Sequence, residues 1–336
     1  KGISIYKVKF KEVDVSDTFF DSFRQEYSHF DNWFNNKNNE YAYVVWDNGQ
    51  KVRAFLYLKV EFWTENYSMI QPSFSPAKRL KIGSFKVDMH GERIFERFLY
   101  IVFKTALSEH VSEIYITLFP KYKSRLLLKE QLLRWGFEKW GIKYKEDVLV
   151  RDFKKYDNGK FRQCYPFHDR PAKAFLISLE HKYEEALFGA DEISFRCDEN
   201  LYPIRKILIC HGQQCGIERS HVLFFYSLAQ HRISHVGVVE DVLCNFKTEK
   251  DFIFACKKRS ILSNNQLIRY WNFCKQTPFV VKILNSYAVS YNDSVKMEPY
   301  VRTLKMTENL TLSPIDREMF DNMIKGTDYE KYIVAN

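Results

Sequence analysis

Residues 81–99 combine an alternating strand pattern, a short turn and an amphipathic helix. The strand pattern ends at Val87, and a turn with one glycine, Gly91, follows before the helix begins. A tight turn of this kind directs the first N–H groups of the helix, which have no partner inside it, beyond the end of the strand. These donors and the positive end of the helix dipole favour an anion. The spacing therefore predicts a binding site for a phosphate-bearing cofactor at the start of this helix.

The charge balance indicates a class of partner. The 51 Lys and Arg residues exceed the 42 Asp and Glu residues, which gives a formal net charge of +9. This excess favours a polyanion such as RNA or DNA, although many basic soluble proteins share it. Much of the positive charge lies in short runs at 121–125, 151–160 and 257–259.

Length and composition describe a globular chain of two domains. Of the 336 residues 46% are hydrophobic, and the 12 Gly and 9 Pro are too few for long disordered tracts. No run of about 18 apolar residues occurs, so we expect no membrane span. Residues 1–6 have the pattern of a strand and lack the profile of a signal peptide.

The seven cysteines are odd in number and scattered along the chain. Their distribution argues against a disulfide framework and favours a reducing, cytoplasmic location. Cys210 and Cys215 could suggest a metal site, but their spacing does not fit a zinc knuckle and no second pair lies nearby. We therefore expect no metal.

The first half of the chain alternates strands and helices. Asp47-Asn-Gly49 separates two strand patterns and is a strong hairpin signal. Mixed alternation predicts an α/β (α+β) fold with a mixed central sheet and helices on both faces. The predicted strands are 3–10, 41–46, 52–60, 80–88, 113–119, 137–143 and 148–153, and the predicted helices are 14–27, 91–109 and 124–135, with a short one at 30–34.

The second half has a different character. A polar segment at 154–173, with two prolines and no periodicity, precedes many short strands and few helices. This pattern predicts a small, strongly bent sheet or barrel. We expect one domain at 1–155, a linker at 156–171 and a second domain at 172–336. The predicted strands are 174–179, 205–210, 222–226, 235–240 and 279–284, and the predicted helices are 181–187, 248–273 and 314–325.

Residues 1–153 resemble the GNAT superfamily of N-acetyltransferases. The resemblance rests on the hairpin at 47–49, on the strand 82–87 that enters a long helix, and on the strand–helix pair that ends in Arg134-Trp-Gly-Phe137. It implies a transferase that uses acetyl-CoA.

The resemblance also assigns cofactor-binding residues. In this superfamily the strand matching 82–87 separates from its neighbour, and its main chain binds the pantetheine arm, which assigns Phe85, Lys86 and Val87. The following turn and helix start bind the pyrophosphate through backbone N–H groups. Those groups belong to His90, Gly91, Glu92, Arg93, Ile94, Phe95 and Glu96.

Two residues are candidates for the chemistry. Many members of the superfamily place a tyrosine four residues before the terminal glycine as the acid that protonates the leaving thiolate. That position is Leu132 here, and Tyr122, near the start of the same helix, is the candidate substitute. Glu61, at the end of the third strand, is the candidate base for the acceptor amine, with a water as the alternative.

Residues 172–312 look like a PUA-like domain of the ASCH/EVE kind. The resemblance rests on 205–211, 222–227 and the Gly-Val-Val-Glu run that ends at 240. The Gly-x-Lys-x-x-Glu-x-Arg signature of catalytic ASCH members is absent, so the implied role is the binding of RNA or of a modified or flipped base. The candidate ligand-binding residues are Tyr226, Ser227, His231, Arg232 and His235, with Lys257, Lys258 and Arg259 for backbone phosphate.

Together these features predict an acetyl-CoA-dependent N-acetyltransferase joined to an RNA-binding module. Its acceptor amine would be presented by RNA or aminoacyl-RNA bound to the second domain. Two alternatives stay open: an acetyltransferase that acts on a protein or a small-molecule amine, and a non-catalytic nucleic-acid-binding protein with a decayed cofactor site.

Overall fold

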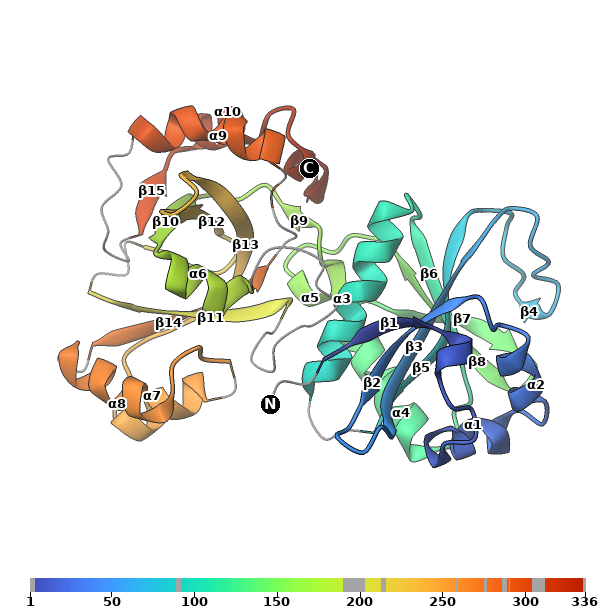
Figure 1. The fold of residues 1–336 in the computed structure, drawn as a ribbon. Helices are drawn as coiled ribbons and strands as arrows, with labels where there is room; N and C mark the ends of the chain where they lie inside the picture. The colour runs from blue at the N-terminus through green and yellow to red at the C-terminus, as the bar shows by residue number, and fades with distance from the viewer. Residues whose placement is uncertain are drawn as a thin grey trace. The chain divides into compact units, whose positions relative to one another are not determined.

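The computed structural model describes residues 4–88, 92–189, 203–212, 216–257, 259–274, 277–285, 289, 291–303 and 312–334. Its described residues divide into two compact units, the first ending at Lys155 and the second beginning at Tyr156. Each unit has its own sheet and its own hydrophobic core (Figure 1).

The first unit is built on an eight-stranded mixed sheet. All neighbouring strands are antiparallel except β5 and β6, which are parallel and are joined by α3 (Glu92–Ser108). In the order of the sheet the strands are β1 (Tyr6–Lys9), β2 (Tyr41–Trp46), β3 (Val52–Glu61), β5 (Arg79–Val87), β6 (Glu113–Leu118), β8 (Glu146–Asp152), β7 (Glu138–Lys143) and β4 (Ile70–Gln71).

Helices cover both faces of this sheet, as the alternation predicted. On one face Phe55 and Tyr57 of β3 pack in a cluster of aromatic side chains. The other face carries Ala54 and Leu56, both fully buried, and α3 packs against β3 and β5. The cluster draws on η1 (Phe10–Glu12), η2 (Thr18–Phe20), α1 (Asp21–Glu26) and α2 (Phe30–Asn35), and α4 (Lys123–Arg134) follows β6.

β5 separates from β6 part-way along its length. Residues 80–82 pair with β6, and the pairing stops there. The other edge of β5 stays paired with β3 as far as Val87. Gly83 forms a bulge, because the register with β3 shifts between Tyr57 and Leu58. A bulge bends its strand and increases the local twist, which accounts for the separation.

The second unit is a bent six-stranded sheet. β13 (Arg232–Leu243) has register shifts with both of its neighbours, and such irregularities bend a long strand. The sheet order is β11 (Arg205–His211), β14 (Pro278–Asn285), β13, β12 (Val222–Ser227), β10 (Ala174–Leu179) and β15 (Ser313–Ile315); β9 (His168–Asp169) pairs with β16 (Ile333–Val334). The helices are α5 (Phe161–Cys164), α6 (His181–Phe188), α7 (Glu249–Cys256), α8 (Asn264–Phe273), α9 (Tyr291–Thr303), α10 (Arg317–Ile324) and η3 (Asp328–Tyr332).

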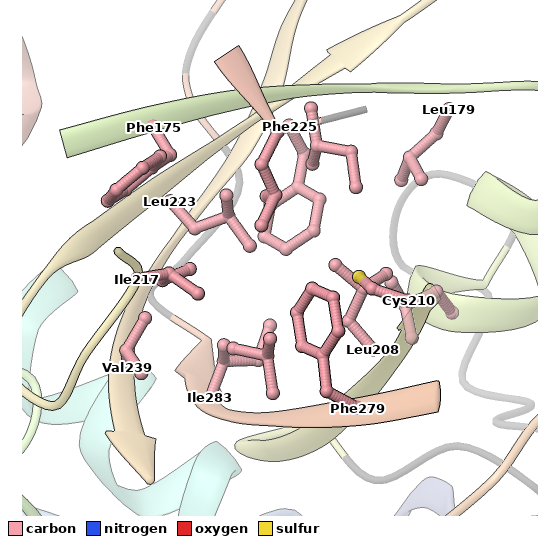
Figure 2. Close-up of a cluster of buried hydrophobic side chains, with 14 residues drawn as sticks. Phe175, Leu179, Leu208, Cys210, Ile217, Leu223, Phe225, Val239, Phe279 and Ile283 are labelled. Atoms are coloured by element: carbon pink, nitrogen blue, oxygen red, sulfur yellow. The ribbon is translucent and has the colours of Figure 1, made fainter. Parts of the chain in front are cut away.

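Apolar side chains fill the inner side of this sheet. Figure 2 shows Phe225, Ile283 and Phe279 pointing toward one another from β12 and β14, with Leu208 and Cys210 of β11 beside them. All five are at most 7% exposed. The sheet therefore forms a half-barrel around a packed core, and the predicted bent sheet is confirmed.

Two predicted helices differ from the structure. The segment 248–273 contains two helices, α7 and α8, because each begins with its own capping box, at Thr248 and at Ser263. The helix predicted over 14–27 begins only at Asp21, after the 3-10 turn η2.

The segment 156–171, for which we expected a linker, contains α5 and β9. No helix in the described part of the chain has the length and apolarity needed to cross a membrane.

A buried histidine joins β9 to the C-terminal part of the second unit. His168 is 2% exposed, and its Nε2 lies 2.6 Å from the hydroxyl of Tyr329. Its Nδ1 lies 2.7 Å from the carbonyl oxygen of Asp169, an acceptor, so Nδ1 carries a proton and donates. Burial lowers the pKa of His168 to about 4.

We expect the second unit to lose stability as the pH falls from about 6.5 to about 4. In this window the unfolded chain binds a proton at His168 that the folded chain does not bind, so acid favours unfolding. A shift of this size corresponds to about 3 kcal/mol. Urea denaturation at pH 7 and pH 4.5 should show a smaller pH effect in His168→Gln than in the parent chain. An equal pH effect in both would contradict the prediction.

We also expect Gly83→Ala to destabilise the first unit by about 1–3 kcal/mol. A Cβ atom at position 83 would lie 2.4 Å from Cδ1 of the Tyr57 ring, so the ring or the strand must shift. Gly49→Ala is the control, because its Cβ would meet only the Asp47 carboxylate, at 3.3 Å. Thermal unfolding should separate the two variants, and equal effects would show that Gly83 has no special role.

Candidate functional site

A cavity of about 560 Å³ lies where β5 and β6 separate. β5 contributes residues 81–85 to its lining, and β6 contributes residues 116–118. The rest of the lining comes from α1, α2, the segment between them, β3, α4 and the β7–β8 hairpin. The bulge at Gly83 thus places an unpaired strand edge along one side of a chamber that could hold a small ligand.

One carbonyl on this edge already has a partner. Arg125, on α4, donates from Nη1 to the carbonyl oxygen of Phe85 at 2.9 Å. Its guanidinium also forms an ion pair with Glu26 at 2.9 Å and lies 4.6 Å from the centre of the Phe23 ring. The side chains of Arg125 and Glu26 are only 7% and 2% exposed. Because each charge is buried and needs the other, loss of either partner would be strongly destabilising.

A second carboxylate faces the cavity without a cationic partner among the described residues. Glu146, the first residue of β8, accepts hydrogen bonds from the hydroxyls of Tyr27 and of Thr117, the latter at 3.1 Å. Glu146 is 6% exposed. Burial, followed by the negative charge of Glu146, raises the pKa of Tyr27 well above its ordinary value. Tyr27 therefore stays protonated and holds the carboxylate by donating to it.

Lysine side chains form the opposite part of the lining. Lys59 on β3 and Lys81 on β5 are paired across the two strands. Their ammonium groups lie 3.4 Å and 3.7 Å from the same Glu61 carboxylate oxygen. Burial lowers the pKa of Lys81, and the nearby charge of Lys143 lowers it further. Lys143 also lines the cavity.

The structure places the two candidate catalytic residues outside the cavity lining. Glu61 is 1% exposed and accepts hydrogen bonds from the hydroxyls of Tyr67, at 3.1 Å, and Tyr115, at 2.6 Å. Its other carboxylate oxygen, Oε1, is the one that the ammonium groups of Lys59 and Lys81 contact. Tyr122 is the N-cap residue of α4 and is not among the cavity residues.

The residues assigned to the pantetheine arm lie on the separated part of β5. Phe85 lines the cavity, and its ring packs against Phe95, with ring centres 5.5 Å apart. The ammonium of Lys86 is bonded to the carbonyl of Phe19, away from the cavity, and burial lowers its pKa. Val87 ends the strand and stays paired with β3.

The residues assigned to the pyrophosphate are only partly described. His90 and Gly91 lie outside the described residues, and Glu92 and Arg93 are placed only as the first residues of α3. The side chains of Ile94, Phe95 and Glu96 are buried, at 3%, 5% and 0% exposure. The phosphate site at this turn therefore stays a prediction.

The residues proposed for nucleic acid do not share one environment. Ser227 is fully buried and donates to Glu184 at 2.5 Å. His235 stacks on Phe188, with ring centres 3.8 Å apart. Burial, and then repulsion by Lys206, lowers the pKa of His235 to about 3, so its ring is neutral at neutral pH.

The remaining nucleic-acid candidates are spread over two regions. Tyr226 is buried, whereas His231 is exposed in the turn before β13, where Arg232 donates to Gln230 at 2.6 Å. Lys257 is exposed after α7, and Arg259 donates to the carbonyl of Arg205 at 2.9 Å. Lys258 lies outside the described residues.

Sequence reasoning missed the cavity carboxylate and its support. Glu146 fell in a gap between two predicted strands, and Tyr27 was the last residue of a predicted helix. A usable signal existed, because strands at 137–143 and 148–153 with a short connection form a hairpin, and its turn brings an acidic residue to a strand end. Across the described ranges, no group of three or more His, Cys, Asp or Glu side chains could hold a metal ion.

No family profile and no curated protein sequence matches the chain. Solved structures similar to it include both expected classes. ASCH from Zymomonas mobilis shares 11% identity over 47% of this chain and 97% of its own, with a TM-score of 0.33. The GNAT family N-acetyltransferase YhbS from Escherichia coli, in complex with CoA, shares 11% over 45% of this chain and 82% of its own, with a TM-score of 0.28.

A third similar structure is N-acetylglutamate synthase from Neisseria gonorrhoeae, complexed with coenzyme A and N-acetyl-glutamate. It shares 13% identity over 45% of this chain and 36% of its own, with a TM-score of 0.31. Each of the three covers just under half of the chain. Structures named as GNAT and as ASCH proteins thus both occur among those similar to the chain.

Proposed function

We propose that the chain is an acetyl-CoA-dependent N-acetyltransferase whose reaction takes place in the cavity beside β5 and β6. One observation carries this proposal: a buried carboxylate, Glu146, faces a 560 Å³ cavity whose wall is an unpaired strand edge. An unpaired edge can bind the amides of a pantetheine arm as it would bind a neighbouring strand. A carboxylate at the same cavity can take the proton that an attacking amine must lose.

The residues of the site fit acetyl-CoA with one adjustment. Residues 83–87 have no strand partner on the side of β6, so their main chain is available to a linear ligand with amide groups. The carbonyl of Phe85 is the exception, because Arg125 donates to it. A pantetheine amide can use this carbonyl only if it replaces or shares the arginine hydrogen bond. The proposed phosphate contacts at 90–96 come from the sequence resemblance.

The reaction needs positioning and one proton transfer. Bound acetyl-CoA supplies the acetyl thioester. The amine nitrogen forms a bond to the acetyl carbon, the bond from that carbon to sulfur breaks, and the sulfur leaves as a thiolate. Glu146 takes the proton from the nitrogen, held in place by Tyr27 and Thr117. The thiolate takes up a proton on release, and positioning supplies much of the rate.

The proposal revises the candidate base. We assign the base to Glu146 because it faces the cavity, whereas Glu61 does not line it and is held by two tyrosines and two lysines. Tyr122 receives no role, since it does not line the cavity.

We propose RNA binding by the second unit as a separate property. The resemblance of residues 172–312 to PUA-like domains supports it, whereas residues 156–336 carry only 2 of the 9 net positive charges of the chain. The side chains of Ser227 and His235 are buried with partners, so the exposed side chains of Lys257 and His231 are the better candidates for contact. The core in Figure 2 is packed with apolar side chains, which directs any nucleic acid to the outer surface.

We expect Glu146→Gln to lower kcat by about 100-fold or more, since general-base catalysis contributes about that much. The amide keeps the size of the side chain, so the Kd for acetyl-CoA should stay within about twofold. Acetyl transfer and calorimetric titration with acetyl-CoA measure the two quantities. Glu138→Gln is the control, because Glu138 is 62% exposed on β7 and forms its ion pair with exposed Lys155. A Glu146→Gln variant as active as this control would remove the base assignment.

We expect the full chain to bind RNA at low salt, with an affinity that falls as salt rises. Lys257→Gln should weaken binding without changing the affinity for acetyl-CoA. Filter binding at two salt concentrations measures the affinity for RNA. The same measurement on protein saturated with acetyl-CoA shows whether the two ligands bind independently. The absence of RNA binding at about 50 mM salt would leave the transferase proposal intact and remove the RNA-presented acceptor.

A further inference from the structure

Four lysines line the same cavity: Lys37 from the turn after α2, Lys59 from β3, Lys81 from β5 and Lys143 from β7. Together with Arg125 they give five cationic side chains, whereas only two carboxylates, Glu26 and Glu146, belong to the lining. Glu26 is already paired with Arg125. Within the lining, cationic side chains therefore outnumber carboxylates. Outside the lining, Glu40 pairs with Lys37 at 3.0 Å, and Glu61 and Glu65 lie 3.4 Å and 3.2 Å from Lys59.

Two of these lysines are held close together at a cost. Lys59 and Lys81 are direct cross-strand partners, and like charges in such a pair destabilise a sheet. Glu61 offsets this repulsion, because one of its carboxylate oxygens lies within 3.7 Å of both ammonium groups. Burial and the charges of Lys143 and Lys59 lower the pKa of Lys81. Glu65 offsets the repulsion as well, since its carboxylate lies 3.2 Å from the Lys59 ammonium. Two carboxylates outside the cavity lining thus hold this cross-strand lysine pair in place.

Each ammonium still has donors to offer. An ammonium carries three N–H donors. Among the described carboxylates, Lys81 contacts Glu61, which is 1% exposed and does not line the cavity. Lys143 forms no ion pair within 4.0 Å with any described carboxylate, although Glu146 follows it in the same hairpin. Donors in this wall are therefore available to an anion inside the cavity.

Aromatic side chains lie next to the lysines. The ammonium of Lys37 lies 4.9 Å from the ring centre of Tyr57 and 5.4 Å from that of Trp33. The two rings meet edge to face at 5.9 Å, and both line the cavity. An aromatic wall excludes water and strengthens the attraction between a lysine and an anion.

We propose that the acceptor amine of this enzyme carries a carboxylate or a phosphate, and that the lysine wall of Lys59, Lys81 and Lys143 binds this group while Glu146 receives the amine. The inference rests on the proposed function, since it names the second substrate of the same site. It favours a small anionic amine as the acceptor, because the positive charge lies in the wall of a cavity of limited volume.

The test compares, in each of two pairs, an amine that carries an anionic group with a neutral amine of the same chain length. The probes are 4-aminobutyrate against 4-aminobutanamide, and 3-aminopropyl phosphate against 3-methoxypropylamine, titrated into CoA-saturated full-length protein. We expect the charged member of at least one pair to bind at least tenfold more tightly than its neutral partner, as expected for charge-assisted hydrogen bonds. The pair that shows the preference identifies the group as carboxylate or phosphate.

Two variants and a control assign the effect to the wall. Lys143→Gln and Lys81→Gln should each remove most of the preference for the charged amine while leaving binding of the neutral amine within about twofold. Lys145→Gln should leave the preference unchanged, because Lys145 is exposed in the same hairpin and does not line the cavity. If Lys81→Gln fails to fold, Lys143→Gln alone decides.

The outcomes separate this inference from the transferase proposal. Protein that binds CoA but shows no preference within either pair overturns the anionic acceptor and leaves the transferase proposal standing. A preference that survives both lysine variants also overturns the assignment to this wall. Protein that does not bind CoA overturns both proposals.

Discussion

The interruption of pairing between β5 and β6 is the feature on which the rest of the site depends. Three residue pairs join the two strands, and the bulge at Gly83 then bends β5 away. The bend is possible because position 83 has no side chain and the Tyr57 ring occupies the place where one would be. An uninterrupted ladder would close the gap, and neither the free strand edge nor the cavity beside it would exist.

Most buried charges around this gap have a partner of opposite charge. Arg125 and Glu26 satisfy each other, while Glu61 is shared by two lysines and two tyrosine hydroxyls. Glu146 differs, since hydroxyl groups alone hold it among the described residues. A carboxylate supported only by neutral donors can accept a proton without breaking an ion pair. This difference explains why Glu146, and not the equally buried Glu61, suits proton transfer.

The fold could largely be predicted from periodicity, because long alternating and amphipathic segments have one stable arrangement around a core. The strand at 174–179 and the helix at 92–108 are examples. The site could be predicted only in part. The main chain of β5 was correctly expected to separate from its neighbour, but Glu61, the candidate base, is buried under two tyrosines and does not line the cavity. One of these tyrosines, Tyr115, lies on β6, and no local pattern around residue 61 reports a partner so distant in sequence.

The hydrogen bond from Arg125 to the Phe85 carbonyl has a consequence for the energetics of ligand entry. A ligand that donates to this carbonyl replaces one hydrogen bond with another, so the net gain in binding free energy at that atom is small. The guanidinium meanwhile keeps its bond to Glu26, so no isolated charge is created. Exchange of the hydrogen bond at this carbonyl thus contributes little to affinity, and selectivity must come from the groups that a ligand contacts elsewhere in the cavity.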